Sequence, residues 1–258
     1  MTFAKVTLHR ILLLYTYNPT LMESRTLTLA RKEEICDNTW EFSFEKPENF
    51  DFIAGQYMIW DIPEGKHKDD RPSFRSLSMG SAPCEEFLKT TMRASESAFK
   101  KNIVALEPGD TVSVKGPVGH FVLPEDETIP VTFVVGGVGI TPARSMLVQS
   151  VCDKSERPLK LFYSNLNPNT APYWEEMENL DLKNYACVNT MSHMDDAPEL
   201  AWEKETGFIC ADMLTRHEAV DPRMKYYVVG TKGFIEAMKG VIEECGISKD
   251  KVVVDNFG

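Results

Sequence analysis

Residues 131–147 read VTFVVGGVGITPARSML, an apolar run that breaks into a glycine-rich turn and then into a stretch of helical character. The opening residues are β-branched or aromatic and apolar nearly throughout, which is typical of a central strand in a parallel sheet. The next three glycines, Gly136, Gly137 and Gly139, let the backbone turn tightly and approach an anion without interference from a Cβ atom. The run therefore predicts a strand, a turn and a helix in close succession.

The helix in this run is expected to begin at Thr141, which fits an N-cap residue, with Pro142 at the first helical position. Free N–H groups at such a helix start can bind a pyrophosphate. The spacing of the glycines is not G-x-G-x-x-G, so a turn that simply closes a β–α connection remains the alternative for this segment alone. Its company in the rest of the chain favours the nucleotide-binding interpretation.

A second informative stretch, residues 71–83, reads RPSFRSLSMGSAP. Polar Arg75, Ser76 and Ser78 alternate there with apolar Leu77 and Met79, as in a strand. An arginine in such a strand can present its guanidinium fork to a phosphate. The stretch is therefore a candidate binding segment.

With these two segments and a third, VKGPVGHFVLP at residues 114–124, the chain resembles the ferredoxin-NADP reductase superfamily. In that family a flavin-binding antiparallel barrel precedes a nicotinamide-dinucleotide domain. The resemblance covers about residues 24–258 and implies a two-domain fold, with an N-terminal antiparallel β-barrel followed by an α/β parallel-sheet nucleotide-binding domain.

In the family an R-x-Y-S-type segment binds the flavin. Arg75, Ser76, Leu77 and Ser78 match it here, with Leu77 at the usual aromatic position. The resemblance implies that Arg75 neutralises a flavin phosphate and that Leu77 packs on the face of the flavin ring. Ser78 is expected to hydrogen-bond the ring edge, which makes it the predicted catalytic residue.

The resemblance extends to three further segments, two in the first domain and the glycine-rich run itself. Ser97 and Lys100 align with the stretch that carries flavin phosphate contacts, and Gly116 begins the G-P-x-G turn that closes the barrel. The GGVGITP run matches the family's motif for the pyrophosphate of the pyridine nucleotide.

The end of the chain departs from the family's C-G-P-x-x-M signature. Gly230 is retained, but Val229 stands where cysteine is expected and Thr231 where proline is expected. In the family that cysteine lies near the nicotinamide and the flavin N5 atom. Phe257 is a candidate for the terminal aromatic residue that shields the flavin in many relatives.

The function that the resemblance implies is transfer of a hydride from NADH or NADPH to bound FAD, with FMN as the less common flavin, and then of electrons to a separate acceptor. Ferredoxin or flavodoxin is the expected acceptor. Two alternatives remain open: a flavin or ferric reductase, and a subunit of a larger redox complex with little turnover of its own. NADH is favoured because residues 163–174, where relatives bind the adenosine ribose, contain no arginine or lysine.

The order of sequence patterns predicts the domain boundaries. Short alternating stretches bounded by turn residues indicate antiparallel strands up to about residue 124, and alternating strands and helices follow from residue 131. We therefore expect a flavin-binding domain at 24–124 and a nucleotide-binding domain at 125–258. Residues 1–23 form an N-terminal extension for which no structure is predicted.

Composition limits the function classes further. The net charge is −11, with 15 basic and 17 acidic residues through position 124 and 13 and 22 after it, which argues against a nucleic-acid-binding protein. The six cysteines lie far apart without metal-ligand spacing, so no iron–sulfur or zinc site is expected. They are expected to be buried reduced thiols in a cytoplasmic protein. Neither a signal peptide nor a membrane span is indicated.

Overall fold

The computed structural model describes residues 24–62, 65, 67–196 and 202–256. The chain divides into two compact units, each treated separately below. The first comprises residues up to Leu123 together with Arg144–Gln149, and the second comprises Pro124–Ala143 and the residues from Ser150 onward. The predicted domain boundary at residue 124 lies beside this division, but the return of residues 144–149 to the first unit has no signal in the sequence.

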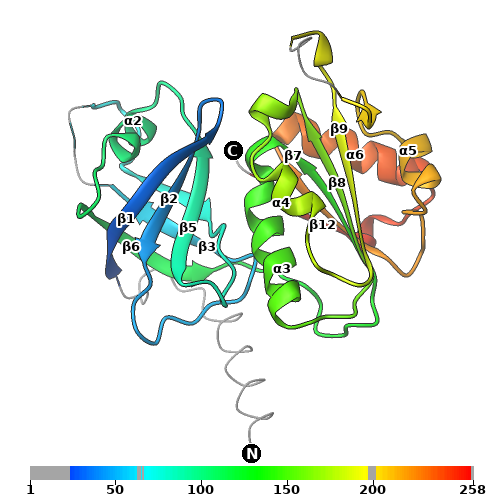
Figure 1. The fold of residues 1–258 in the computed structure, drawn as a ribbon, viewed down its shortest axis with the longest axis horizontal. Coiled ribbons are helices and arrows are strands. Elements are labelled where there is room, and N and C mark those ends of the chain that lie inside the picture. Colours follow the sequence, from blue (N-terminus) through cyan, green and yellow to red (C-terminus); the bar gives the residue numbers. More distant parts are fainter. Residues whose placement is uncertain (1–23, 63–64, 66, 197–201, 257–258) are drawn as a thin grey trace, which may run out of the picture. The chain divides into compact units, whose positions relative to one another are not determined.

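The first unit is built on a six-stranded antiparallel sheet with the strand order β4-β3-β6-β1-β2-β5 (Figure 1). Its elements are β1 (Ser24–Cys36), β2 (Thr39–Glu45), β3 (Tyr57–Asp61), β4 (Phe74–Ser78), β5 (Phe87–Arg93), the helix α2 (Ala98–Val104) and β6 (Thr111–Val118).

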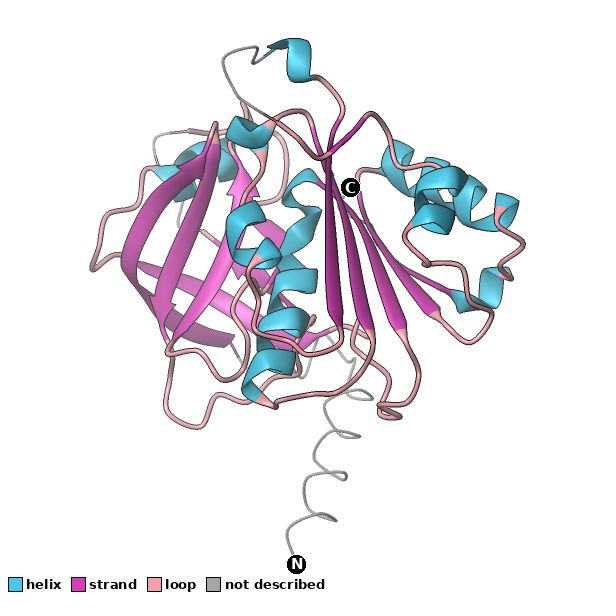
Figure 2. Cartoon of the chain, turned by 45° about the vertical axis from the view of Figure 1, so that its right-hand side comes forward, coloured by secondary structure: helices cyan, strands magenta, loops and turns pink. Residues whose placement is uncertain are grey.

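Alternating burial along these strands places one face of the sheet on an apolar core. Trp60 of β3 and Phe44 of β2 are fully buried there, with ring centroids 5.0 Å apart. Hydrogen bonds also link the two outermost strands: Gly80 N, two residues after β4, donates to Lys89 O of β5 at 2.7 Å, and the Thr90 hydroxyl of β5 donates to Ser78 O at 3.0 Å. The sheet thus curves into the expected barrel (Figure 2).

The second unit contains a six-stranded sheet in which every pair is parallel, in the order β10-β9-β8-β7-β11-β12. The strands are β7 (Val131–Gly136), β8 (Leu159–Asn165), β9 (Tyr185–Met191), β10 (Glu205–Thr206), β11 (Lys225–Gly230) and β12 (Val252–Asn256). The helices are α3 (Ile140–Cys152), α4 (Trp174–Glu178), α5 (Ala211–Arg216) and α6 (Lys232–Glu244), with short 3₁₀ turns η1 (Gly137–Gly139), η2 (Pro168–Thr170), η3 (Met194–Asp196) and η4 (Lys249–Lys251).

Helices cover both faces of this sheet, with α3 and α4 on one side and α5 and α6 on the other (Figure 2). Because both faces are covered, residues 131–135 of the central strand β7 are all buried, Thr132 included. The two predicted fold classes, an antiparallel barrel followed by a parallel α/β sheet, are both confirmed.

The order of the parallel strands reverses beside β7. The chain proceeds outward from β7 through β8 to β9, and later returns to place β11 on the opposite side of β7. In α/β sheets, ligands bind outside the carboxyl ends of the adjacent strands at such a reversal of strand order. Gly136 ends β7 and Gly230 ends β11 at this point.

The cysteines differ from the expectation of reduced thiols. Among those the structure describes, the free thiols are Cys36, Cys187, Cys210 and Cys245, whereas Cys84 and Cys152 are disulfide-bonded. Cys210 is also exposed rather than buried. Wide spacing in the sequence does not prevent a disulfide, because folding brings distant residues together.

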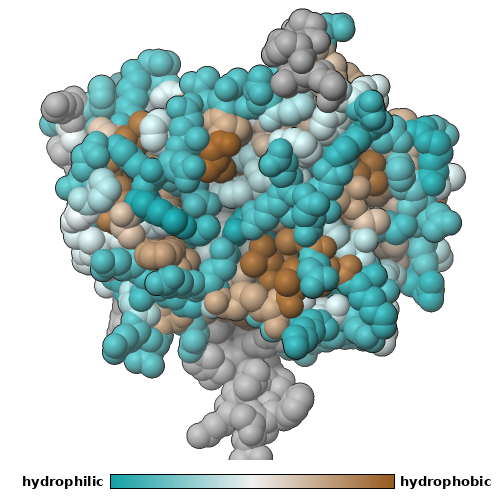
Figure 3. Space-filling model, in the orientation of Figure 1, coloured by the Kyte–Doolittle hydropathy of each residue, from teal (hydrophilic) through white to brown (hydrophobic). Residues whose placement is uncertain are grey.

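The surface drawn in Figure 3 is mostly hydrophilic, with apolar side chains gathered in separate patches. Within the described residues, no helix has the length and apolar character needed to cross a membrane. In the same part of the chain, no cluster of three or more histidine, cysteine or acidic side chains is arranged to hold a metal ion.

Candidate functional site

The glycine-rich turn leaves β7 at Gly136, forms η1 and continues directly into α3. The prediction that Thr141 caps the helix is wrong, since α3 begins at Ile140 and Thr141 lies inside its first turn. The hydroxyl of Thr141 donates to Val138 O at 2.7 Å instead. Pro142 is accommodated in the same turn because backbone N–H groups there have no partner within the helix.

The three glycines of the turn have different structural roles. A Cβ atom on Gly139 would lie 2.8 Å from Val229 O, so this glycine lets the turn pack closely against β11. Gly137 has φ +55° and open space where a Cβ would be, so it alone of the three combines a left-handed backbone with open surroundings. The predicted approach to an anion therefore fits Gly137 best.

Gly136 and Gly230 are covered by one aromatic ring. A Cβ on Gly136 would lie 3.0 Å from the Phe234 ring, and one on Gly230 would lie 2.7 Å from it. Phe234 belongs to the first turn of α6, whose N-cap is Thr231, and Phe234 N donates to the Thr231 hydroxyl at 3.3 Å. Threonine at the expected proline position thus serves as a helix cap, and Val229 before it is fully buried.

Tyr163 of β8 supports the turn from within the sheet. Its hydroxyl oxygen lies 3.0 Å from the carbonyl oxygens of both Gly137 and Pro172, so the O–H group can donate a hydrogen bond to either. The ring is fully buried, so the hydroxyl fixes the turn next to Gly137. Our sequence reasoning missed this residue, although a tyrosine within a buried apolar strand is itself a signal that a polar partner lies nearby.

Asn165 ends β8 at the same edge of the sheet. It lies in the strand rather than in a loop, is only 5% exposed, and neither polar atom of its side-chain amide has a hydrogen-bond partner. Buried amides normally find partners, so an unsatisfied one at a ligand-binding edge fits a polar ligand group. The basic residue of β11, Lys225, begins that strand and lies at the opposite end of the sheet from Asn165.

The first unit contains a similar unsatisfied group at the end of β4. Ser78 is 3% exposed and its hydroxyl oxygen has no hydrogen-bond partner. Its backbone is held firmly, because the Thr90 hydroxyl donates to Ser78 O at 3.0 Å. A fixed hydroxyl without a partner fits the predicted contact with a flavin ring edge. Leu77 beside it is half-buried and packs against the barrel core, while Ser76 is exposed.

Three basic side chains gather near the predicted flavin phosphate contacts. Burial, and then the positive charges of Arg93 and Arg75, lower the pKa of the Lys100 ammonium below its ordinary value of 10.5. Lys100 Nζ donates to Arg93 O at 2.7 Å, and the Arg75 guanidinium lies 5.6 Å from the centroid of the Phe99 ring. Mutual repulsion among these cations is relieved by an anion, so the cluster fits a phosphate group.

Local contacts orient two members of this region. Arg75 Nη1 donates to Pro72 O at 2.6 Å and to Phe74 O at 2.7 Å, which fixes the guanidinium beside its own strand. Ser97 is the N-cap of α2 and accepts a hydrogen bond from Lys100 N at 3.4 Å. The structure therefore brings Arg75, Ser97 and Lys100 into one neighbourhood.

The remaining predicted residues are placed as follows. Gly116 has φ +139° and precedes a cis peptide bond to Pro117, so the G-P-x-G segment ends β6 in a turn that favours glycine. Phe257 lies outside the described residues.

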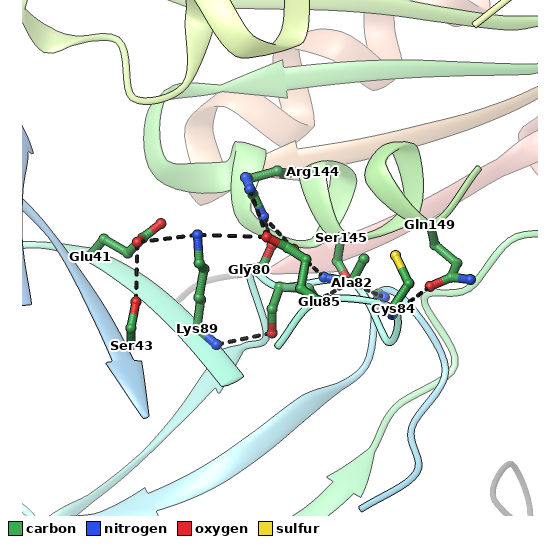
Figure 4. A network of polar contacts seen from close by, with 12 residues as sticks. Glu41, Ser43, Gly80, Ala82, Cys84, Glu85, Lys89, Arg144, Ser145 and Gln149 are labelled. Carbon is green, nitrogen blue, oxygen red and sulfur yellow. Dashed lines mark hydrogen bonds and ion pairs between the residues drawn. The ribbon is translucent and has the colours of Figure 1, made fainter. Parts of the chain in front are cut away.

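A buried ion-pair network, which our sequence reasoning missed, follows the Ser78 segment (Figure 4). The guanidinium of Arg144 donates to both carboxylate oxygens of Glu85, at 2.9 and 3.1 Å, and to Gly80 O at 2.7 Å. Lys89 lies between Glu85 and Glu41, at 3.6 and 3.4 Å. The partners Arg144 and Glu85 are 59 residues apart, so no local pattern could have revealed the pair.

Two family models match the chain. A model of an oxidoreductase FAD-binding domain matches residues 26–123, and a model of an oxidoreductase NAD-binding domain matches residues 133–240. Together they span most of both units described above. The chain therefore belongs to the ferredoxin-NADP reductase superfamily and is a FAD- and NAD-binding oxidoreductase.

Individual relatives agree with this assignment. The chain is 25% identical over 250 residues to flavohemoprotein A of Dictyostelium discoideum, which covers 92% of this chain and 61% of that protein. It is 27% identical over 253 residues to a flavohemoprotein of Bacillus cereus, covering 91% and 61%. The chain thus spans less than two thirds of the length of these relatives.

Solved structures share the fold. A ferredoxin NADP+ reductase from Neisseria gonorrhoeae with bound FAD and NADP superposes with a TM-score of 0.76 at 16% identity, covering 90% of this chain and 98% of that one. The cytochrome b5 reductase domain of Ulva prolifera nitrate reductase gives a TM-score of 0.76 at 21% identity, covering 92% and 98%.

Proposed function

We propose that this oxidoreductase takes electrons from NADH through FAD bound on its first unit and delivers them to a separate protein acceptor, a ferredoxin or a flavodoxin. The observation that carries the proposal is the buried Ser78 hydroxyl, which has no hydrogen-bond partner. Leaving such a group unsatisfied costs about 1–3 kcal/mol. A flavin ring edge would satisfy it, which gives Ser78 a functional reason to be there.

The proposed division of work follows from the contacts described above. Arg75 and Lys100 hold the flavin phosphate by charge, and Ser78 orients the ring through a hydrogen bond. In the second unit, the open turn at Gly137 holds the nucleotide pyrophosphate through backbone N–H groups. Bound FAD supplies the chemistry, since it accepts a hydride from a nicotinamide and releases electrons to an acceptor.

The preference for NADH rests on the end of β8. A 2′-phosphate calls for an arginine or lysine near the adenosine ribose, and this segment offers Ser164 and the unsatisfied amide of Asn165 instead. An amide can hydrogen-bond ribose hydroxyls but does not neutralise a phosphate. Because Lys225 begins β11, at the opposite end of the sheet, it does not supply the missing charge.

The choice of acceptor rests on charge. Ferredoxins and flavodoxins are acidic, so docking requires exposed cations, and Lys68 and Arg71 of the first unit are exposed. Lys89 does not contribute, because its side chain is only 13% exposed and lies beside Glu41 and Glu85. The proposed docking surface is therefore smaller than the count of basic residues in this unit suggests.

The test is to purify the protein, record its visible spectrum with and without added FAD or FMN, and then add NADH and NADPH separately under anaerobic conditions. Bleaching of a flavin band near about 450 nm by NADH, with a weaker response to NADPH, is expected. Reduction of an acidic protein acceptor should weaken as salt is added. A protein that binds neither flavin and consumes neither nucleotide would instead be a partner-binding subunit.

A further inference from the structure

The segment that follows Ser78 is held by one stretch of helix α3, Arg144–Gln149. Arg144 Nη1 donates to Gly80 O at 2.7 Å, and the Ser145 hydroxyl donates to Ser81 O at 2.7 Å. Gln149 Oε1 accepts a hydrogen bond from Cys84 N at 3.1 Å. Residues 80–84 are thus fixed by three side chains of this stretch.

Arg144 is the most costly of these contacts to maintain. Its side chain is 5% exposed, and burying a guanidinium and a carboxylate together costs desolvation energy that their attraction does not reliably recover. A contribution to the stability of the fold is therefore a poor explanation for the Arg144–Glu85 pair. Its geometry is specific, because the guanidinium bridges the Glu85 carboxylate and Gly80 O at once (Figure 4). Such a pair fixes the position of residues 80–85 relative to helix α3.

Helix α3 connects Arg144 directly to the glycine turn. It runs without interruption from Ile140 to Cys152, directly after η1. Arg144 lies one helical turn after Ile140, so a ligand that fixes the start of α3 also restricts the backbone that carries Arg144. Two binding segments, Gly137 at the start of this path and Ser78 at its end, are thus joined by covalent chain and buried hydrogen bonds.

We propose that Arg144 is a positioning residue that links nucleotide binding at the Gly137 turn to flavin binding at Ser78. The inference rests on the proposed function. The nucleotide fixes the start of α3, and the flavin fixes the segment after Ser78 that Arg144 holds. The second ligand to bind therefore meets a more ordered protein and binds more tightly. Thermodynamic linkage requires the effect to be reciprocal.

The experiment measures the affinity of the apoprotein for FAD by quenching of flavin fluorescence, with and without saturating NAD+, which cannot reduce oxidised flavin. In the wild-type protein, NAD+ should lower the Kd for FAD by about fivefold or more, the lower range of typical allosteric coupling. The readout is the ratio of the two Kd values, and a residue that only stabilises the fold would not change that ratio.

The variant is the double substitution Arg144→Met with Glu85→Met, because removing Arg144 alone would leave a buried carboxylate unpaired. The double variant keeps the Ser145 and Gln149 contacts, so its Kd ratio should fall clearly below the wild-type ratio, toward one. The matched control is Arg157→Met. Arg157 is buried like Arg144, but it donates to the backbone oxygens of Pro124, Asp126 and Ile129 in the second unit. This control should retain the wild-type ratio.

Three results would overturn the inference while leaving the proposed function intact: a wild-type ratio of one, an unchanged ratio in the double variant, or an equal loss of coupling in Arg157→Met. Near-ultraviolet circular dichroism of each variant confirms that the compared proteins are folded. A wild-type protein that binds no FAD at all overturns the proposed function, and the inference with it.

Discussion

The two units carry the proposed phosphate contacts in different forms. The first unit brings together the positively charged side chains of Arg75, Arg93 and Lys100. Burial, and then repulsion from the two arginines, lowers the pKa of Lys100. The second, which carries most of the net negative charge, offers backbone N–H groups at the Gly137 turn. Charge tolerates small displacements, whereas a backbone turn depends on close fit. Substitutions should therefore affect the two units differently.

The largest expected effect on stability follows from filling the close contact in the second unit. Gly139→Val places a Cβ where Val229 O lies 2.8 Å away, and the next nearest atoms also belong to the backbone of β11, which leaves little room to adjust. We expect the free energy of unfolding to fall by about 1–3 kcal/mol, as for overpacked cores. Chemical denaturation measures this change.

The control for this substitution is Gly240→Ala, in α6, where nothing lies within 4 Å of the added Cβ. Alanine should stabilise that helix by about 0.5–1 kcal/mol. Equal stability of Gly139→Val and the wild-type protein would show that the turn does not need its close packing against β11.

On the charged side of the comparison, Arg75→Ala should weaken FAD binding by about tenfold or more, since a hydrogen bond to a charged group contributes about 1.5–3 kcal/mol. Flavin content after purification and FAD titration measure the loss, which should shrink as salt is added. Lys249→Ala, which removes an exposed lysine of the second unit, is the matched control. Unchanged flavin content in Arg75→Ala would remove Arg75 from the phosphate site.

Ser78→Ala should have opposite effects on the apoprotein and the flavin complex. Removing a buried hydroxyl without a partner should leave the apoprotein as stable as before, or more stable by about 1 kcal/mol. The same change should weaken FAD binding and shift the visible spectrum. If the thermal stability of the apoprotein drops while FAD affinity is unchanged, the hydroxyl has a structural partner and no flavin contact.

The smallest effect concerns pH. Burial alone would raise the pKa of Glu85, but the hydrogen bonds and charge of Arg144, with Ala82 N–H and Lys89, lower it below its ordinary value of 4.5. A lowered acid pKa contributes stability above that value, and the contribution is lost as pH falls below about 4.5. Urea denaturation of wild-type protein and Glu85→Gln between neutral and acidic pH should show curves that converge on acidification.

Glu48→Gln, which changes an exposed glutamate of the same unit, is the control for this pH series. Curves for wild-type protein and Glu85→Gln that stay parallel at every pH would contradict the prediction.

Much of the fold could be predicted because its signals are local. The nearly continuous apolar run at 131–135 marks a buried strand, and short alternating stretches mark the antiparallel sheet. The start of α3 was misplaced because the 3₁₀ turn at Gly137–Gly139 begins the helical path before Thr141. Such a turn depends on contacts with β11 that the local sequence does not contain.

The site could be predicted only in outline. The positions of Ser78, Arg75 and Lys100 follow from motifs, but whether each side chain is satisfied depends on distant partners. Arg144 and Glu85 are 59 residues apart. Similarly, Phe234 determines why Gly136 must lack a side chain, although the two lie on different elements.

The assignment of residues 144–149 to the first unit has a practical consequence for dividing the gene. A fragment that stops at residue 123 ends at the predicted domain boundary, yet it lacks the side chains that satisfy Gly80 O, Ser81 O and the Glu85 carboxylate. A separately expressed first half would therefore carry polar groups without their partners. The domain boundary that the sequence predicts at residue 124 does not separate all the residues of one unit from those of the other.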